Sequence, residues 1–151
     1  MSTPLDFLVG TWRGEGVGGY PTLEADFRFG QQVEFIDYGK PVLQYTSATW
    51  RLDDPSTPMA RESGFWRPVG EGRLEVVLAQ PTGFVEVFYG EVTGTKVELA
   101  TDLVARTRTA KEVSAERRLY GLVDGQLMYA MDLAAVGQPL QPHLSATLRR
   151  V

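Results

Sequence analysis

Apolar and polar residues alternate with a period of two along most of this chain, and Gly, Pro and Asp interrupt the alternation at short intervals. A period of two puts apolar side chains on one face of a strand and polar side chains on the other. The pattern predicts ten strands, at Thr11–Val17, Leu23–Ile36, Val42–Leu52, Arg61–Pro68, Arg73–Gln80, Phe84–Val92, Val97–Leu103, Val113–Leu122, Leu127–Leu133 and His143–Arg149.

Turn-forming residues separate these runs, as in Asp53-Asp54-Pro55, Gly70-Glu71-Gly72 and Asp124-Gly125. Only Pro4–Val9 has helical character, and it is one or two turns long. Ten short strands at near-regular spacing predict an all-β fold, either an antiparallel barrel or a sandwich. We find no linker and no convincing repeat, so residues 1–151 are predicted to form a single domain.

The glycine-rich stretch Gly10–Pro21 allows three interpretations. Gly14, Gly16 and Gly19 match the spacing G-x-G-x-x-G of a dinucleotide-binding turn, but that turn needs a βαβ unit, and another alternating run follows here. A flexible linker does not suit a stretch that contains a tryptophan. As a strand, the stretch has one almost bare face, which indicates either a bend in a barrel wall or the close approach of a flat ligand.

Composition narrows the classes of function. Hydrophobic residues make up 43% and charged residues 23% of the chain, and the formal net charge is −4, which argues against a nucleic-acid or anionic-membrane partner. The chain has no cysteine, which excludes disulfides, zinc–thiolate sites and iron–sulfur clusters. The start of the sequence resembles no signal peptide, and no apolar run is long enough to span a bilayer, so we expect a cytoplasmic protein.

His143 is the single histidine. An isolated histidine is usually a surface or core residue with one hydrogen bond, but Pro139 and Pro142 stiffen the segment that leads to this one. One imidazole without cysteine cannot form a structural zinc site, whereas it is enough for a haem, whose porphyrin supplies four ligands. Strand parity would turn His143 outward if Leu144 faces the interior, unless His143 precedes the strand.

Several segments together resemble the nitrobindin family over nearly the whole chain: GTWRGEGVGGYPTLE, ESGFWRP, VVLAQPTGFVEV, TAKEVSAERR and VGQPLQPHLSATLRR. The family's G-x-W-x-G-x-G element matches Gly10, Trp12, Gly14 and Gly16, and its terminal P-L-Q-x-H-L element includes His143. Nitrobindins are ten-stranded antiparallel up-and-down barrels, of the calycin type seen in fatty-acid-binding proteins, that hold haem b near one mouth. The resemblance therefore implies that His143 is the axial ligand of one ferric haem b, and that the glycine face lets the macrocycle lie close to the first strand.

The resemblance implies further contacts and an activity. Thr22 would lie near the haem, Lys111 would pair with a propionate, and Leu133 and Met131 would face the open side of the iron, with Phe88 as a further apolar candidate. Leu127 and Tyr129 share a strand face with these two residues and are more readily explained as barrel core. A five-coordinate ferric iron would bind nitric oxide and isomerise peroxynitrite to nitrate.

Other interpretations remain open at this stage. Lipocalin and fatty-acid-binding barrels also carry G-x-W near the start and an arginine in the last strand, so Trp12 could stack under Arg149 or Arg150 in a carrier of a small hydrophobic ligand. A haem sensor or nitric oxide carrier is a third possibility. We expect the imidazole's second nitrogen to donate to a carbonyl or carboxylate that the sequence does not identify. The oligomeric state is open, a homodimer included.

Overall fold

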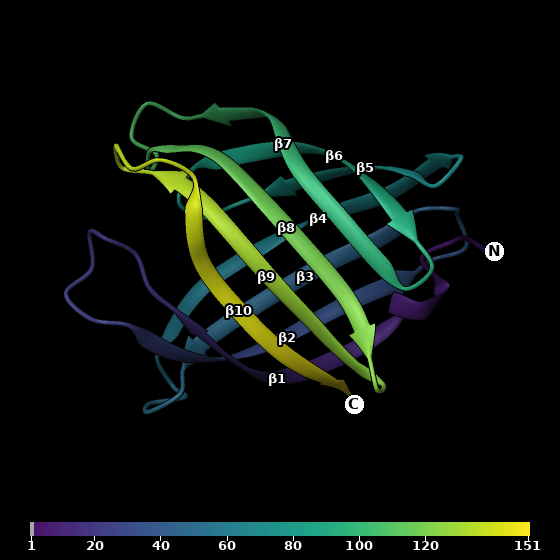
Figure 1. Ribbon diagram of the computed structural model, residues 1–151, viewed down its shortest axis with the longest axis horizontal. Helices are drawn as coiled ribbons and strands as arrows, with labels where there is room; N and C mark the ends of the chain where they lie inside the picture. The colour runs from purple at the N-terminus through teal and green to yellow at the C-terminus, as the bar shows by residue number, and fades with distance from the viewer. Residues whose placement is uncertain (1) are drawn as a thin grey trace.

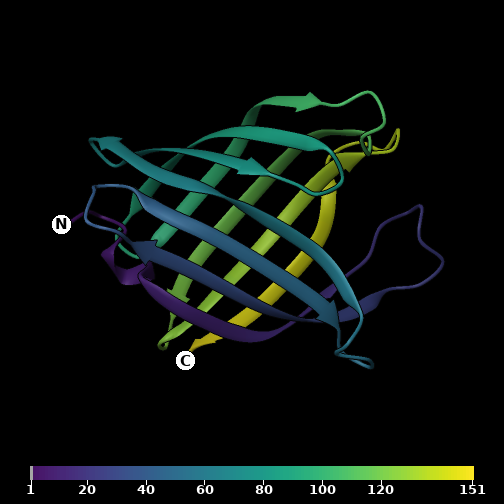
Figure 2. The same cartoon turned by 180° about the vertical axis from the view of Figure 1, so that it is seen from behind.

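The computed structural model describes residues 2–151, so Met1, which the predicted domain includes, lies outside the described residues. Ten antiparallel strands pair in chain order, and β1 pairs with β10 to close the barrel (Figures 1 and 2). The fold is thus the predicted up-and-down barrel. The strands are β1 (Gly10–Gly18), β2 (Phe27–Asp37), β3 (Leu43–Arg51), β4 (Pro58–Gly70), β5 (Arg73–Ala79), β6 (Phe84–Thr93), β7 (Lys96–Arg106), β8 (Val113–Val123), β9 (Gln126–Ala135) and β10 (Gln141–Arg150).

The predicted strands are all present, with one notable error of boundary. The prediction started β2 at Leu23, whereas the strand begins at Phe27, and residues 19–26 form a loop in which Leu23 is exposed. The β1–β2 ladder ends where Gly18 pairs with Phe27. Residues 23–26 therefore have no β1 residue with which to pair. The predicted helical segment is a single 3-10 turn, η1 (Asp6–Leu8), and the described residues contain no helix long and apolar enough to cross a membrane.

The two ends of the barrel differ. The loops β1–β2, β3–β4, β7–β8 and β9–β10 extend from one end, at the left of Figure 1, which we call the open end. Short hairpins and η1 lie at the other, which we call the closed end; Asp124 and Gly125, for example, have positive φ values of 51° and 76°, as a two-residue type I′ turn requires.

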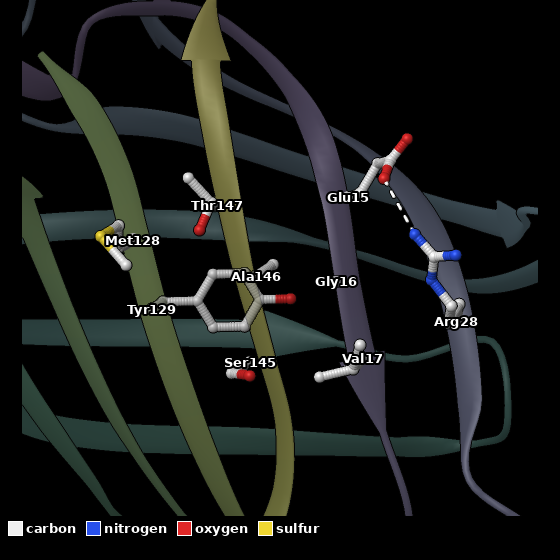
Figure 3. A pocket seen from close by; sticks show the side chains of 9 residues that line it. All are labelled: Glu15, Gly16, Val17, Arg28, Met128, Tyr129, Ser145, Ala146 and Thr147. Atoms are coloured by element: carbon white, nitrogen blue, oxygen red, sulfur yellow. Dashed lines mark hydrogen bonds and ion pairs between the residues drawn. The ribbon is translucent and has the colours of Figure 1, made fainter.

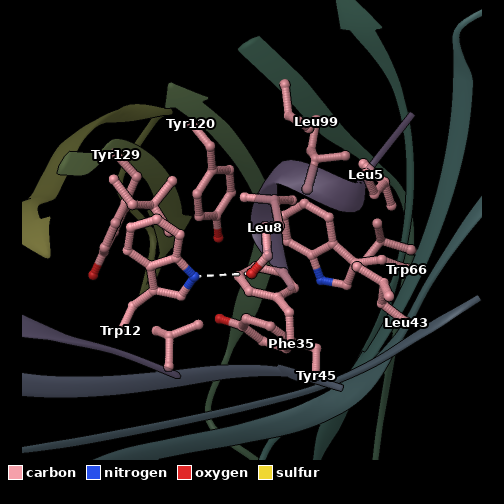
Figure 4. Close-up of a cluster of buried hydrophobic side chains, with 14 of the residues drawn as sticks. Leu5, Leu8, Trp12, Phe35, Leu43, Tyr45, Trp66, Leu99, Tyr120 and Tyr129 are labelled. Atoms are coloured by element: carbon pink, nitrogen blue, oxygen red, sulfur yellow. Dashed lines mark hydrogen bonds between the residues drawn. The ribbon is translucent and has the colours of Figure 1, made fainter. Parts of the chain in front are cut away.

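The apolar core fills the closed end (Figure 4). Leu5 and Leu8 of the η1 segment pack against it, and the indole Nε1 of Trp12 donates to the carbonyl oxygen of Leu8 at 2.8 Å. The guanidinium of Arg150 stacks over the Trp12 ring at 4.2 Å from its centroid and donates to the carbonyl oxygens of Phe7 and Val9. The stacking of an arginine on Trp12, which the carrier interpretation allowed for Arg149 or Arg150, therefore exists with Arg150. We call this contact the tryptophan–arginine latch, and it covers the closed end.

The bare face of β1 is occupied by the barrel's own atoms. A Cβ at Gly14 would overlap the carbonyl oxygen of Thr147 on β10, because the two backbones approach closely there. A Cβ at Gly16 would overlap the ring of Phe29. Glycine is thus required at both positions by the packing of the wall, as the bend interpretation expects.

One seam of the barrel is open along part of its length. β7 and β8 pair only from Lys96 to Ala100, and beyond that point β7 pairs with β6 alone. The Thr101 hydroxyl bridges the parting strands, since it accepts from the Glu116 amide at 3.0 Å. The wall therefore separates at the open end.

Candidate functional site

His143 lies in a β-bulge of β10 at the open end. Pro142 faces Asp132 and Leu144 faces Met131, so two steps along β10 match one step along β9, and His143 is the extra residue. A bulge interrupts alternation, which explains how both His143 and Leu144 are partly buried although they are consecutive. The strand begins before His143, at Gln141, so the conflict of parity is resolved by the bulge and not by a late strand start.

Gly19 holds His143 at two points. The Gly19 amide donates to the His143 carbonyl oxygen at 2.9 Å, and the ring Nδ1 lies 2.9 Å from the Gly19 carbonyl oxygen. A carbonyl can only accept, so Nδ1 carries the hydrogen in this contact. This is the carbonyl partner that we expected for the second ring nitrogen. The tautomer leaves Nε2 with a free lone pair, which is the arrangement that axial ligation of a haem iron requires.

The surroundings of the imidazole favour its neutral form. Burial lowers the pKa of His143, and the nearby charge of Lys111 lowers it further, while the hydrogen bond to Gly19 and the charge of Glu116 act in the opposite direction. The net shift is downward. A neutral imidazole is the ligating form, so the donor chemistry of this residue fits a haem.

Aromatic rings fix the orientation of the imidazole. Tyr20 meets it edge-on with ring centroids 5.3 Å apart, and Phe27 lies at 6.3 Å. The Tyr20 hydroxyl donates to the carbonyl oxygen of Leu133 at 2.9 Å and accepts from the amide of Ala135 at 3.0 Å. The β1–β2 loop is thereby tied across to β9, and Tyr20 joins a small apolar cluster at this end that includes Leu133. The sequence analysis did not predict that Gly19 and Tyr20 contact His143. These contacts depend on the bulge of β10, where the β1–β2 loop meets His143.

The structure brings some of the predicted site residues to the same end as His143. Leu133 is buried and Met131 is partly buried on the inward face of β9, as parity predicted, and Leu127 and Tyr129 are core residues of the same face. Lys111 is exposed in the β7–β8 loop, close enough for its charge to act on His143. Thr22 is exposed in the β1–β2 loop.

Other predicted residues lie elsewhere. Gly10 and Trp12 lie at the closed end, where Trp12 pairs with Arg150, about six residues along β1 from the His143 end. Gly14 and Gly16 belong to the β1–β10 wall described above. Phe88 is fully buried within the barrel, with the Arg118 guanidinium 5.2 Å from its ring centroid. The structure therefore does not gather the G-x-W-x-G-x-G residues around His143.

A buried charged network lies in the middle of the barrel, and the sequence analysis missed it. Arg118 forms two hydrogen bonds with Glu62, at 2.6 and 2.9 Å, and an ion pair with Glu116 at 2.7 Å, and its Nη2 lies 4.0 Å from Glu86. Its own side chain is 2% exposed and that of Glu86 is 0% exposed. We call these four residues the Arg118 network. A signal was present, because each of them shares strand parity with apolar core residues, such as Tyr120 for Arg118 and Phe88 for Glu86.

Two hollows mark the surface. One of ≈ 310 Å³ lies along β1, β9 and β10, and its lining does not include His143 (Figure 3). The other, of ≈ 540 Å³, opens between the start of β2 and the β3–β4 loop, and its wall includes Phe27, whose ring also contacts His143. The second hollow is therefore linked to the imidazole through Phe27, and His143 itself does not line it.

The sequence matches one family over almost its full length. Residues 1–150 match the family described as "THAP4-like, heme-binding beta-barrel domain". The chain belongs to this haem-binding β-barrel family. The resemblance to nitrobindins and the barrel fold are confirmed together.

Similar proteins agree with the assignment. The chain is 50% identical to "Peroxynitrite isomerase" of Frankia casuarinae over 98% of this chain and 84% of the relative, and 51% identical to a protein of the same name from Salinispora arenicola over 95% and 76%. It is 47% identical to "Ferric nitrobindin-like protein" of Kineococcus radiotolerans over 98% and 92%. The crystal structure of Rv2717c from M. tuberculosis has a TM-score of 0.90 and 38% identity, and the match covers 100% of this chain and 99% of that one.

Proposed function

We propose that this protein binds one ferric haem b through His143, binds nitric oxide, and isomerises peroxynitrite to nitrate in the cytoplasm. The observation that carries the proposal is the two-point contact of Gly19 with His143, which fixes the imidazole as a neutral donor with Nε2 free. The names of the relatives support the choice of reaction. The isomerisation rearranges the atoms of peroxynitrite and needs no further substrate.

Each residue around His143 has its own role in the proposed function. Nε2 binds the iron, and the hydrogen bond from Nδ1 to the Gly19 carbonyl holds the ring and increases the basicity of Nε2. Tyr20 prevents the ring from rotating, because it packs edge-on and is itself held to β9. Since His143 is the only histidine of the sequence, no second imidazole of this chain would compete with it for a bound haem.

The remaining open-end residues hold the periphery and keep water out. Met131 and Leu133 present apolar side chains from β9, which would exclude water and confine reactive fragments. Lys111 lies in an exposed loop, and its charge acts on the imidazole. Its ammonium group would therefore pair with a propionate of a haem bound at His143. Bound haem supplies the redox-active iron at which peroxynitrite rearranges.

Stopped-flow kinetics of peroxynitrite decay test the proposal. Haem-loaded protein should accelerate the decay and raise the yield of nitrate over nitrite, in proportion to the haem bound. Apoprotein is the control, and equal acceleration by apoprotein would remove the haem from the mechanism. A loaded protein without effect would instead favour the sensor or carrier interpretations.

A further inference from the structure

One carboxyl group of the Arg118 network, that of Glu86, has an oxygen without a hydrogen-bond partner. Oε2 of Glu86 is buried and has no hydrogen-bond partner, while Oε1 accepts from the Gln80 amide at 3.1 Å. Burial raises the pKa of Glu86 to about 10, and the neighbouring Glu116 carboxyl adds to this rise. Glu86 therefore keeps its proton at neutral pH.

The proton on Glu86 sets the charge of the network. Arg118 carries one positive charge, Glu62 is ionised because its interactions with Arg118 hold its pKa at about 2 against the effect of burial, and Glu116 is paired with Arg118. With Glu86 protonated, the four side chains carry one net negative charge. Tyr45, Gln80 and Tyr120 surround the network with hydrogen bonds and add no charge.

This charge lies close to the imidazole. Glu116 faces Leu133 across the β8–β9 ladder, and Leu133 faces Gln141 across the β9–β10 ladder, beside the bulge. Two strand spacings put the backbones of Glu116 and Gln141 about 10 Å apart. The charge of Glu116 acts to raise the pKa of His143, against the larger effect of burial. Lys111, which is exposed in the β7–β8 loop, acts on the same imidazole with the opposite sign.

We propose that the Arg118 network sets the oxidation-state and ligand preference of a haem held by His143. The inference rests on the proposed function, because it requires haem at His143. Ferric porphyrin has a core charge of +1 and ferrous porphyrin has none, so a buried negative charge stabilises the ferric form. The same charge weakens the binding of anionic ligands, peroxynitrite included, relative to neutral ligands such as nitric oxide. Glu62, Glu86, Glu116 and Arg118 thus influence ligand preference without contacting the ligand.

The size of the effect follows from Coulomb's law. For one charge at about 10 Å and an effective dielectric constant of about 20, the preference for ferric over ferrous haem changes on the order of tenfold. A tenfold change corresponds to about 59 mV in a one-electron potential. Surface charges are screened more strongly, so Lys111 should have a smaller effect that decreases with salt.

Reduction potentials of haem-loaded variants test the inference. Glu86→Gln exchanges a neutral group for a neutral group and should leave the ferric-to-ferrous preference within about twofold of wild type. The double variant Glu86→Gln with Glu116→Gln removes the net charge and should shift the preference about tenfold towards ferrous haem. Glu116→Gln alone should lie between them, because Glu86 can then release its proton and replace the lost charge beside Arg118.

A surface control, a ligand-affinity measurement and a variant of the opposite charge complete the test. Glu98→Gln, which removes an exposed carboxylate from the outer face, is the matched surface control and should have no effect. The double variant should also bind azide more tightly while its affinity for neutral imidazole stays unchanged. Lys111→Gln, in an exposed loop, should shift the potential in the opposite direction to Glu116→Gln. If the double variant does not fold, the single variant Glu116→Gln is the test of the Arg118 network.

The possible failures are distinguishable. If wild type binds no hemin, the proposed function fails before any potential is measured. If all variants load and show the wild-type potential, His143 holds haem but the Arg118 network does not tune it. Shifts in the same direction for Lys111→Gln and Glu116→Gln would also overturn the inference.

Discussion

The glycines of β1 have two possible explanations, which are close packing of the barrel wall and close approach of a flat ligand. Gly14 lacks space for a side chain because the β10 backbone occupies it. We predict that Gly14→Val destabilises the apoprotein by about 1–3 kcal/mol, the usual cost of overpacking. Urea unfolding checks this, with Thr11→Val on the opposite face of β1 as the control. A stable Gly14→Val apoprotein that has lost haem affinity would instead support the flat-ligand interpretation.

The buried carboxyl groups predict an unusual pH dependence of stability. Glu62 has a lowered pKa in the folded state, so its contribution is present above the unfolded value of about 4.3 and is lost as the pH falls towards 2. Glu86 has a raised pKa, so the folded state loses stability as the pH rises above about 4.3 towards 10. The apoprotein should melt at its highest temperature in mildly acidic solution.

Melting curves of Glu86→Gln between pH 4 and 9 isolate this effect. A glutamine cannot ionise, so the alkaline decrease in melting temperature should become shallower than in wild type. The amide group retains a partner for Gln80, which makes the variant a conservative one. An unchanged alkaline slope would show that Glu86 is ionised in the folded protein.

At the scale of elements, the β1–β2 loop and the β10 bulge form one unit. Tyr20 ties the loop to β9, and removing its hydroxyl leaves the buried amide of Ala135 without a partner. Tyr20→Phe should therefore cost about 1–3 kcal/mol of stability and weaken hemin binding, although the ring still packs on His143. Tyr38→Phe, in an exposed position, is the control in the same unfolding assay. Equal stability of both variants would mean that the loop is not held by Tyr20.

The same elements show what the sequence could and could not predict. Alternation predicted all ten strands and the inward face of β9, because burial enforces a period of two. It could not predict the bulge, since one extra residue in a ladder depends on the partner strand. The contact between Gly19 and His143 depends on that bulge and spans 124 positions, so no local pattern encodes it.

At the scale of the whole molecule, the barrel separates stability from function. The closed end holds the tryptophan–arginine latch and most of the apolar core, while the open end holds the imidazole, the loops and the parted β7–β8 seam. The Arg118 network lies between them. The resemblance identified His143, but charges in the interior were overlooked because inward-facing glutamates look like surface residues when only composition is considered.

The most direct test of the central claim is a hemin titration of wild type and His143→Ala, followed by the spectrum of the cyanide or nitrosyl complex. Wild type should show a saturable one-to-one change and the spectrum of imidazole-ligated haem. His143→Ala should lose that signature and bind more weakly, and the melting temperature of its apoprotein should change little because the imidazole is only partly buried. A His143→Ala protein that keeps the wild-type spectrum would contradict the account, and a wild type without saturable binding would favour a lipid carrier.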